Sequence, residues 1–330
     1  MSGTVSVPWR ERVSPAAEAH PMNTAAIAVT GLRKTFGDKV VLGGIDLEVR
    51  AGSVFALLGP NGAGKTTTVN VLTTLMKADG GTVRVAGHDL ATEAKAIRKS
   101  IGVTGQFAAV DDLLTGRENL RLMADLNGAD TRVIGDLLDR FELVESADKP
   151  ASTYSGGMRR KLDLAMTLVG NPRIIFLDEP TTGLDPRSRR TMWSIIRDLV
   201  AGGVTIFLTT QYLEEADQLA ERIAVLDQGR LVAQGTPDEL KRQIPGTHVR
   251  LRFTTAAELD AAAQVLTDGI RDDETLTLRV PSDGGTTSLR AVLDRLDEYA
   301  LSAVEFSVQT PDLDDVFLAL TGHSTEVVAK

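Results

Sequence analysis

The sequence predicts an α/β domain with parallel strands at its centre, followed by a small α+β domain. Apolar segments of strand length occur at 54–58, 174–177, 204–208 and 223–226, interrupted only by Thr205, and stretches with helical periodicity separate them. Buried strands that alternate with helices are typical of a largely parallel sheet. The residues Gln-Ile-Pro-Gly at 243–246 interrupt this pattern, and shorter alternating strands follow. We therefore expect one domain at 24–244 and a second at 245–330.

The individual elements follow from local hydrophobic patterns. Residues 1–23 mix Pro, Ala, Ser and charged residues without periodicity, which indicates a flexible leader, and Met22 is a second candidate start. Alternation at 45–49 predicts a half-exposed strand, and the apolar spacing at 158–169 predicts an amphipathic helix. In the second domain, the same patterns predict strands at 249–253, 276–280 and 304–308 and helices at 256–266, 289–296 and 313–320.

Composition limits the classes of function. The chain has 330 residues, a hydrophobic fraction of 42% and a net charge of −9, without a dominating basic block, which counts against nucleic acid as the main partner. The absence of cysteine excludes disulfides, zinc–thiolate sites and thiol catalysis, and the four histidines lack the spacing of metal ligands. No apolar stretch reaches the roughly 18 to 20 residues that cross a bilayer, so work at a membrane would need another, membrane-spanning chain.

A glycine-rich segment after the apolar strand at 54–58 predicts a phosphate-binding loop. It fits the pattern G-x-x-x-x-G-K-[ST], and a helical stretch follows it directly. Its residues are Gly59, Pro60, Asn61, Gly62, Ala63, Gly64, Lys65, Thr66 and Thr67. Glycines let successive backbone N–H groups point at a polyphosphate, and the helix N-terminus adds partial positive charge. We expect Lys65 to reach the β- and γ-phosphates and the Thr66 hydroxyl to bind Mg²⁺.

Two carboxylates follow the apolar strand at 174–177. They lie at its C-terminal end, the edge at which open α/β sheets bind ligands. We expect Asp178 to hold Mg²⁺ through water. Glu179, one residue further on, points elsewhere and is placed to polarise a water in line with the γ-phosphate. The sequence thus predicts both halves of a site that hydrolyses a nucleoside triphosphate.

A second anion-binding helix end is predicted at Ser155, Gly156 and Gly157. Serine is a preferred N-cap, and the two glycines expose backbone N–H groups at the start of a helix. One phosphate chain does not need two such helix ends. With this signature, residues 27–240 resemble the ATP-binding subunits of ABC transporters. The resemblance implies that two copies pack head to tail, with each ATP between the phosphate loop of one copy and the signature of the other.

Further segments carry the same resemblance. Phe36 matches the aromatic residue that stacks on the nucleotide base, adenine or guanine, and Gln106 matches the glutamine that senses Mg²⁺ and couples to the membrane subunit. The LTGRENL sequence at 114–120 matches the start of a helical subdomain, expected at about 107–170. Asp185 ends the loop that crosses the dimer in this family. The resemblance therefore implies ATP and Mg²⁺ as cofactors, a homodimer, a separately encoded transmembrane permease subunit as partner, and no nucleic acid.

Gln211 departs from the family, which usually has a histidine here that touches the γ-phosphate and steadies the attacking water. A primary amide can still donate a hydrogen bond to phosphate, but it does not become a cation near neutral pH. With Tyr154, Met158, the ending VFLALTGH and a C-terminal accessory domain, it makes the chain similar to the daunorubicin-resistance branch of drug-export ATPases. This branch implies an ATPase, bound peripherally to the cytoplasmic face of the membrane, that powers export of a hydrophobic drug, antibiotic or lipid.

Other interpretations stay open beside this one. Gln211 also suits a nucleotide-gated clamp that dimerises with ATP but turns over little. Soluble relatives that act on DNA or ribosomes fit less well, because the sequence has neither a long coiled-coil insertion nor a second nucleotide domain. The resemblance implies that the C-terminal domain is a dimerising or regulatory cover. We expect the charge runs at 159–161 and 187–190 to be solvated helix faces.

Overall fold

The computed structural model describes residues 25–105, 109–242, 247–309 and 311–321. The predicted leader at 1–23, Gln106 and the predicted domain boundary at 243–246 lie outside these ranges. The described residues form two compact units, one within Met1–Phe55 and Gly64–Thr209 and one within Ala56–Ala63 and Thr210–Lys330. Strand β3 (Val54–Leu58) contributes residues to both.

Two sheets build the first unit. Strands β1 (Ala25–Phe36), β2 (Lys39–Arg50), β4 (Gly80–Val85) and β5 (His88–Asp89) form an antiparallel sheet in the order β2-β1-β4-β5. The predicted alternation in β2 is confirmed, because Ile45, Leu47 and Val49 are buried while Asp46, Glu48 and Arg50 are exposed. The second sheet has the order β3-β8-β7-β6, in which β6 (Ile101–Thr104), β7 (Ile174–Asp178) and β8 (Thr205–Thr210) are parallel.

The strands of the parallel sheet are buried, as their apolar runs predict. Every residue of β7 and β8 is buried. The Phe176 and Phe207 rings lie 5.5 Å apart, and Phe207 stacks on Phe55 of β3 at 5.4 Å. Since both faces of such a sheet are covered, ligands reach it at the carboxyl ends of its strands. Asp178, the last residue of β7, lies at that edge.

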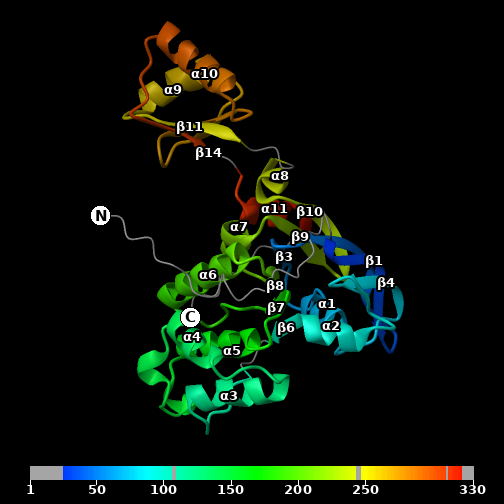
Figure 1. The fold of residues 1–330 in the computed structure, drawn as a ribbon. Coiled ribbons are helices and arrows are strands. Elements are labelled where there is room, and N and C mark those ends of the chain that lie inside the picture. Colours follow the sequence, from blue (N-terminus) through cyan, green and yellow to red (C-terminus); the bar gives the residue numbers. More distant parts are fainter. Residues whose placement is uncertain (1–24, 106–108, 243–246, 310, 322–330) are drawn as a thin grey trace. The chain divides into compact units, whose positions relative to one another are not determined.

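The helices of the first unit include a helical subdomain. Within the described residues they are α1 (Lys65–Leu72), α2 (Ala94–Ser100), α3 (Gly116–Asn127), α4 (Val133–Arg140), α5 (Gly156–Leu168) and α6 (Pro186–Ala201). α3, α4 and α5 contact one another (Figure 1). The LTGRENL sequence begins α3 as expected, because Thr115 caps the helix and forms a capping box with Glu118.

The second unit contains a hairpin and three short helices beside its α+β part. β9 (Arg222–Asp227) pairs antiparallel with β10 (Arg230–Gly235), in the order β10-β9-β3. The last helix, α11 (Leu313–Thr321), packs against β10, α7 (Leu213–Leu219) and α8 (Pro237–Arg242). Among its described side chains, Leu313, Val316 and Phe317 are apolar and buried.

The α+β part has the element order βαββαβ. Its elements are β11 (His248–Arg252), α9 (Ala256–Val265), β12 (Ile270–Asp272), β13 (Thr277–Pro281), α10 (Thr286–Glu298) and β14 (Glu305–Gln309). The strands form an antiparallel sheet in the order β12-β13-β11-β14, and both helices lie together beside it (Figure 1). This is a split β-α-β arrangement. The predicted fold class, α/β with a small α+β C-terminal part, is confirmed.

Candidate active site

The predicted phosphate loop connects β3 to α1. In the second unit, a Cβ on Gly59 would lie 2.2 Å from the Leu226 carbonyl oxygen, so only glycine fits there. Gly62 has a φ of +81°, a left-handed conformation that glycine adopts without strain. In the first unit, the predicted helix α1 begins at Lys65, directly after Gly64 and within the segment assigned to the loop. The loop therefore leads into a helix N-terminus, an arrangement that binds phosphate groups.

Lys65 and Glu179 are brought together in the first unit. Lys65 Nζ lies 3.3 Å from Glu179 Oε1, and both side chains are largely buried. Burial lowers the pKa of Lys65 from its usual range, and the carboxylates of Glu179 and Asp178 oppose this shift. An ammonium and a carboxylate this close can act on one small ligand: the ammonium attracts phosphate oxygens, and the carboxylate accepts a hydrogen bond from water.

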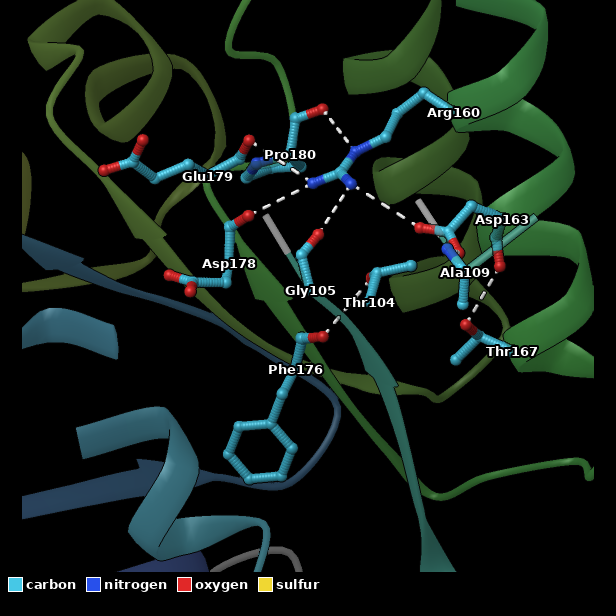
Figure 2. A network of polar contacts seen from close by, with 10 residues as sticks. All are labelled: Thr104, Gly105, Ala109, Arg160, Asp163, Thr167, Phe176, Asp178, Glu179 and Pro180. Atoms are coloured by element: carbon cyan, nitrogen blue, oxygen red, sulfur yellow. Dashed lines mark hydrogen bonds and ion pairs between the residues drawn. The ribbon is translucent and has the colours of Figure 1, made fainter. Parts of the chain in front are cut away.

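Thr209 fixes the turn that carries both carboxylates. Its Oγ1 donates to Asp178 Oδ1 at 2.5 Å and accepts the Glu179 N–H at 3.1 Å. Glu179 has a φ of +49°, a left-handed conformation that costs a non-glycine residue about 1 to 2 kcal/mol. The carboxylates of Asp178 and Glu179 end at separate places, as the sequence predicts (Figure 2). Sequence reasoning missed Thr209, although a hydroxyl at the end of an apolar strand was the available signal.

The residues that the sequence assigns to Mg²⁺ offer oxygen ligands. Asp178 lies at the sheet edge, and Thr66 is exposed in the first turn of α1. Within the described ranges, no group of three or more His, Cys, Asp or Glu side chains is placed to hold a metal ion by itself. Mg²⁺ prefers such hard oxygen ligands and is commonly held by one or two protein oxygens together with phosphates and water. The donor set therefore fits Mg²⁺ bound with a nucleotide.

The predicted signature begins α5. Ser155 is its N-cap, as expected, and its Oγ accepts the Met158 N–H at 3.2 Å. Ser155 and Gly156 are exposed, and a Cβ on Gly156 would meet no atom within 4 Å. A Cβ on Gly157 would lie 2.7 Å from Ser188 Oγ of α6. The helix end is thus open at Ser155 and Gly156 and closely packed at Gly157.

Asp185 is the N-cap of α6. Its carboxylate accepts the N–H groups of Arg187 and Ser188, both at 3.0 Å, and the Ser188 hydroxyl at 2.5 Å. These hydrogen bonds, that of the hydroxyl foremost, lower the pKa of Asp185 below its usual range. The residue therefore fixes the entry of the chain into α6, next to the closely packed Gly157.

Tyr154 differs from the family signature and fills a defined place. Its ring is buried, and its hydroxyl donates to the Ser146 carbonyl at 2.6 Å. Burial raises the pKa of Tyr154, so the phenol keeps its proton. A Cβ on Gly116, the first residue of α3, would lie 2.2 Å from Tyr154 Oη. The tyrosine before the signature and the glycine of LTGRENL are therefore a packed pair.

The expectation that residues 159–161 form a solvated helix face is wrong for Arg160. Arg160 is buried on the same side of α5 as Leu164, one turn later. Asp163, also buried, lies 3.5 Å from it and supplies the counter-charge. Burial raises the pKa of Asp163, and its partners, first the Ala109 N–H and then Arg160, oppose this. The signal in the sequence was an arginine and an aspartate three residues apart within an amphipathic helix.

The structure places two further residues of the family resemblance. Phe36 ends β1 and is 47% exposed, and Lys34 Nζ lies 5.4 Å from its ring centroid. Gln211 is half-buried and directly follows Thr210, whose carbonyl accepts the Gly59 N–H at 3.3 Å in the second unit. Gln211 therefore lies next to the start of the phosphate loop. Gln106 lies outside the described residues.

Known proteins resemble the chain over most of its length. The ABC transporter family model matches residues 42–182, and the model of the C-terminal domain of DrrA1-3-like ATP-binding proteins matches residues 235–321. Daunorubicin resistance ATP-binding protein DrrA3 of Streptomyces coeruleorubidus is 47% identical, covering 93% of this chain and 99% of that protein. Daunorubicin/doxorubicin resistance ATP-binding protein DrrA of Streptomyces peucetius is 47% identical, covering 92% and 94%. Nod factor export ATP-binding protein I of Rhizobium sp. (strain N33) is 38% identical, covering 92% and 100%.

Solved structures show the same architecture. An ATP-binding subunit of an ABC transporter matches with a TM-score of 0.61 at 29% identity, covering 67% of this chain and 93% of that chain. A dimeric ATP-binding cassette in a post-hydrolysis state, bound to ADP and phosphate, matches with a TM-score of 0.58 at 25% identity, covering 64% and 98%. In the part of the chain that the structure describes, no helix combines the length and apolar character needed to cross a membrane. The chain is an ATPase that belongs to the ATP-binding proteins of ABC transporters, in the branch of the daunorubicin resistance ATP-binding proteins.

Proposed function

We propose that this ATPase powers export of a hydrophobic drug, antibiotic or lipid through separate transmembrane permease subunits. Two of the relatives are named for daunorubicin resistance and one for Nod factor export, and these names support an amphiphilic or hydrophobic cargo. Binding to such a permease would hold the chain at the cytoplasmic face of the membrane. The cargo path and its selectivity belong to the permease.

The observation that carries the proposal is the close approach of Lys65 and Glu179 at the end of β7. The loop from Gly59 to Thr67 cradles the phosphates, and Lys65 neutralises the charge of their outer oxygens. Thr66, Asp178 and Gln106 would hold Mg²⁺, which would neutralise phosphate charge when bound. The Glu179 carboxylate accepts a proton from the water that attacks the γ-phosphorus, while the bond to the oxygen of the β-phosphate breaks and ADP leaves.

The exposed N-terminus of α5 supports a shared nucleotide site. Ser155 and Gly156 offer an N-cap hydroxyl and backbone N–H groups to solvent. In the proposed homodimer these groups bind the phosphates of the ATP held by the partner copy. Phe36 stacks on the base, and Asp185 lies in the loop that crosses to the partner. Two ATP molecules would thus close two copies, and hydrolysis would let them separate.

Glu179→Gln tests the shared site. The variant should bind ATP and Mg²⁺ without turnover, so that gel filtration with ATP shows a dimer that the wild type forms only transiently. Glu142→Gln, the same exchange at an exposed residue that pairs with Lys161, is the matched control and should behave like the wild type. A Glu179→Gln variant that stays monomeric with ATP would contradict the shared site.

Export is tested with the permease present. The chain is expressed with a daunorubicin-resistance permease in inverted membrane vesicles, and doxorubicin uptake is followed by its fluorescence. We expect uptake that requires ATP and disappears in Glu179→Gln. Equal doxorubicin uptake by vesicles with the wild type and by vesicles with Glu179→Gln would rule out this role.

Gln211 favours a second candidate, a nucleotide-gated clamp with little turnover. An amide can hold the γ-phosphate but cannot add positive charge as hydrolysis proceeds. Steady-state ATPase rates of the wild type and Gln211→His distinguish the two candidates. A brisk wild-type rate in the presence of the permease rejects the clamp, whereas phosphate release only in Gln211→His supports it.

A further inference from the structure

Helix α5 carries a buried ion pair that the proposed site does not use. Arg160 and Asp163 lie three residues apart, with Arg160 Nη1 3.5 Å from Asp163 Oδ2, and they are 8% and 3% exposed. Removing two charges from water is costly, and a fold retains such a pair where further polar groups satisfy it. The additional partners of this pair therefore indicate its role.

The Arg160 guanidinium binds the turn that carries Glu179 (Figure 2). Its Nε donates to the Pro180 carbonyl at 3.0 Å, and its Nη2 donates to the carbonyls of Asp178 and Glu179 at 3.1 and 3.3 Å. One side chain thus holds three consecutive carbonyl groups. Glu179 is the middle residue of this turn and has a left-handed backbone conformation, which persists only where its surroundings support it.

The same ion pair holds the chain on both sides of residues 106–108. Arg160 Nη1 donates to the Gly105 carbonyl at 2.7 Å, and Asp163 Oδ1 accepts the Ala109 N–H at 2.9 Å (Figure 2). The pair therefore connects three segments that are distant in sequence: the signature helix, the turn after β7, and the chain that flanks 106–108.

We propose that Arg160 is a positioning residue for ATP hydrolysis. It fixes the turn that aims the Glu179 carboxylate, and Asp163 holds the guanidinium in place. This inference rests on the proposed role of Glu179. Arginine suits the task because its planar group presents five N–H donors in a fixed fork, whereas lysine offers one nitrogen and cannot reach Pro180 and Gly105 together.

The expected defect is in the hydrolysis step. The contacts of Arg160 in this network are with backbone carbonyls and Asp163, so its loss should leave nucleotide affinity intact. A displacement of about 1 Å at a reacting group can lower a rate by about 100-fold. Arg160→Lys should therefore lower single-turnover hydrolysis by on the order of 10- to 100-fold. Asp163→Asn keeps an acceptor for the Ala109 N–H and should show a smaller fall of the same kind.

The full chain is used for the test. Phosphate release from radiolabelled ATP gives the hydrolysis rate, and titration with a fluorescent ATP analogue gives the affinity. Arg197→Lys makes the same exchange at an exposed position of α6 and is the matched control. An unchanged hydrolysis rate in Arg160→Lys, or a parallel loss of affinity, overturns the proposal.

A double variant separates positioning from a general structural role. If Arg160 acts through Glu179, then Arg160→Lys should not lower the residual rate of Glu179→Gln any further. If Arg160→Lys lowers the hydrolysis rate of Glu179→Gln by the same factor as it lowers the wild-type rate, the proposal is also overturned. If Glu179→Gln alone hydrolyses ATP at the wild-type rate, the proposed role of Glu179 fails instead. Should Arg160→Lys not fold, Asp163→Asn supplies the same comparison with Arg160 intact.

Discussion

The packed pair of Gly116 and Tyr154 predicts a substitution whose effect changes sign. In Gly116→Ala the new Cβ would lie 2.2 Å from Tyr154 Oη, which is a clash. The next nearest atoms, Tyr154 Cζ at 3.2 Å and the Ala147 carbonyl oxygen at 3.5 Å, are much less crowded. Overpacking of this kind costs about 1 to 3 kcal/mol, whereas alanine in place of a helical glycine gains up to about 1 kcal/mol. Gly116→Ala should therefore destabilise the wild type by about 1 to 2 kcal/mol and stabilise Tyr154→Phe by up to about 1 kcal/mol.

Urea unfolding followed by tryptophan fluorescence measures this effect. Trp193 is buried in α6 of the first unit, and Trp9→Phe removes the only other tryptophan of the chain. The two substitutions should compensate each other with a coupling free energy of about 1 to 3 kcal/mol. Gly135→Ala is the matched control, because a Cβ on this helical glycine of α4 would meet no atom within 4 Å. An equal cost of Gly116→Ala in both backgrounds would refute this explanation of Gly116.

Other substitutions test single positions of the site. Gly59→Ala should abolish binding of a fluorescent ATP analogue, because its Cβ would lie 2.2 Å from the Leu226 carbonyl oxygen. Gly62→Ala, whose Cβ would meet no atom within 4 Å, should lose only a little affinity for the analogue. Equal losses of affinity in the two variants would contradict this. Thr209→Val should lower the free energy of unfolding by about 1 to 3 kcal/mol, because a buried carboxylate loses its donor, and Thr209→Ser should restore it; equal effects of valine and serine would exclude a role for the hydroxyl. Asp185→Ala should lower the melting temperature at pH 7. Because the pKa of Asp185 is lowered in the folded protein, its contribution is present above the unfolded pKa of about 3.9 and is lost as the pH falls through the folded value, so the difference from the wild type should shrink below pH 4.

Local patterns in the sequence predicted the parts of the fold that depend on neighbours along the chain. The apolar runs at 174–177 and 204–208 became the buried strands β7 and β8. The Ser155 cap followed from helix-end chemistry, since the preferences for caps act over three or four residues.

Contacts between distant segments were not predictable in this way. Alternation at 304–308 predicts β14, but it does not show that β14 is the sheet edge, where Phe306 is 53% exposed. The requirement for glycine at 116 comes from Tyr154, which belongs to another segment of the helical subdomain. Arg160 looks like a solvated charge in the sequence, because its carbonyl partners carry no side-chain signal of their own.

Helix α5 combines two tasks, one at its N-terminus and one a turn later along the helix. Its N-terminus exposes Ser155 and Gly156, which the proposed dimer offers to the ATP of the partner copy. One turn later, Arg160 points inward and holds the turn of Glu179 in its own copy. If both proposals hold, one helix carries the residues that contact the nucleotide of the partner copy and also Arg160, which positions the Glu179 carboxylate of its own copy. Arg160→Lys should then leave ATP-driven dimerisation of Glu179→Gln unchanged, whereas Ser155→Arg should abolish it, and gel filtration distinguishes the two. If both Arg160→Lys and Ser155→Arg abolish dimerisation, the two tasks are not separable, and α5 acts as a single structural element.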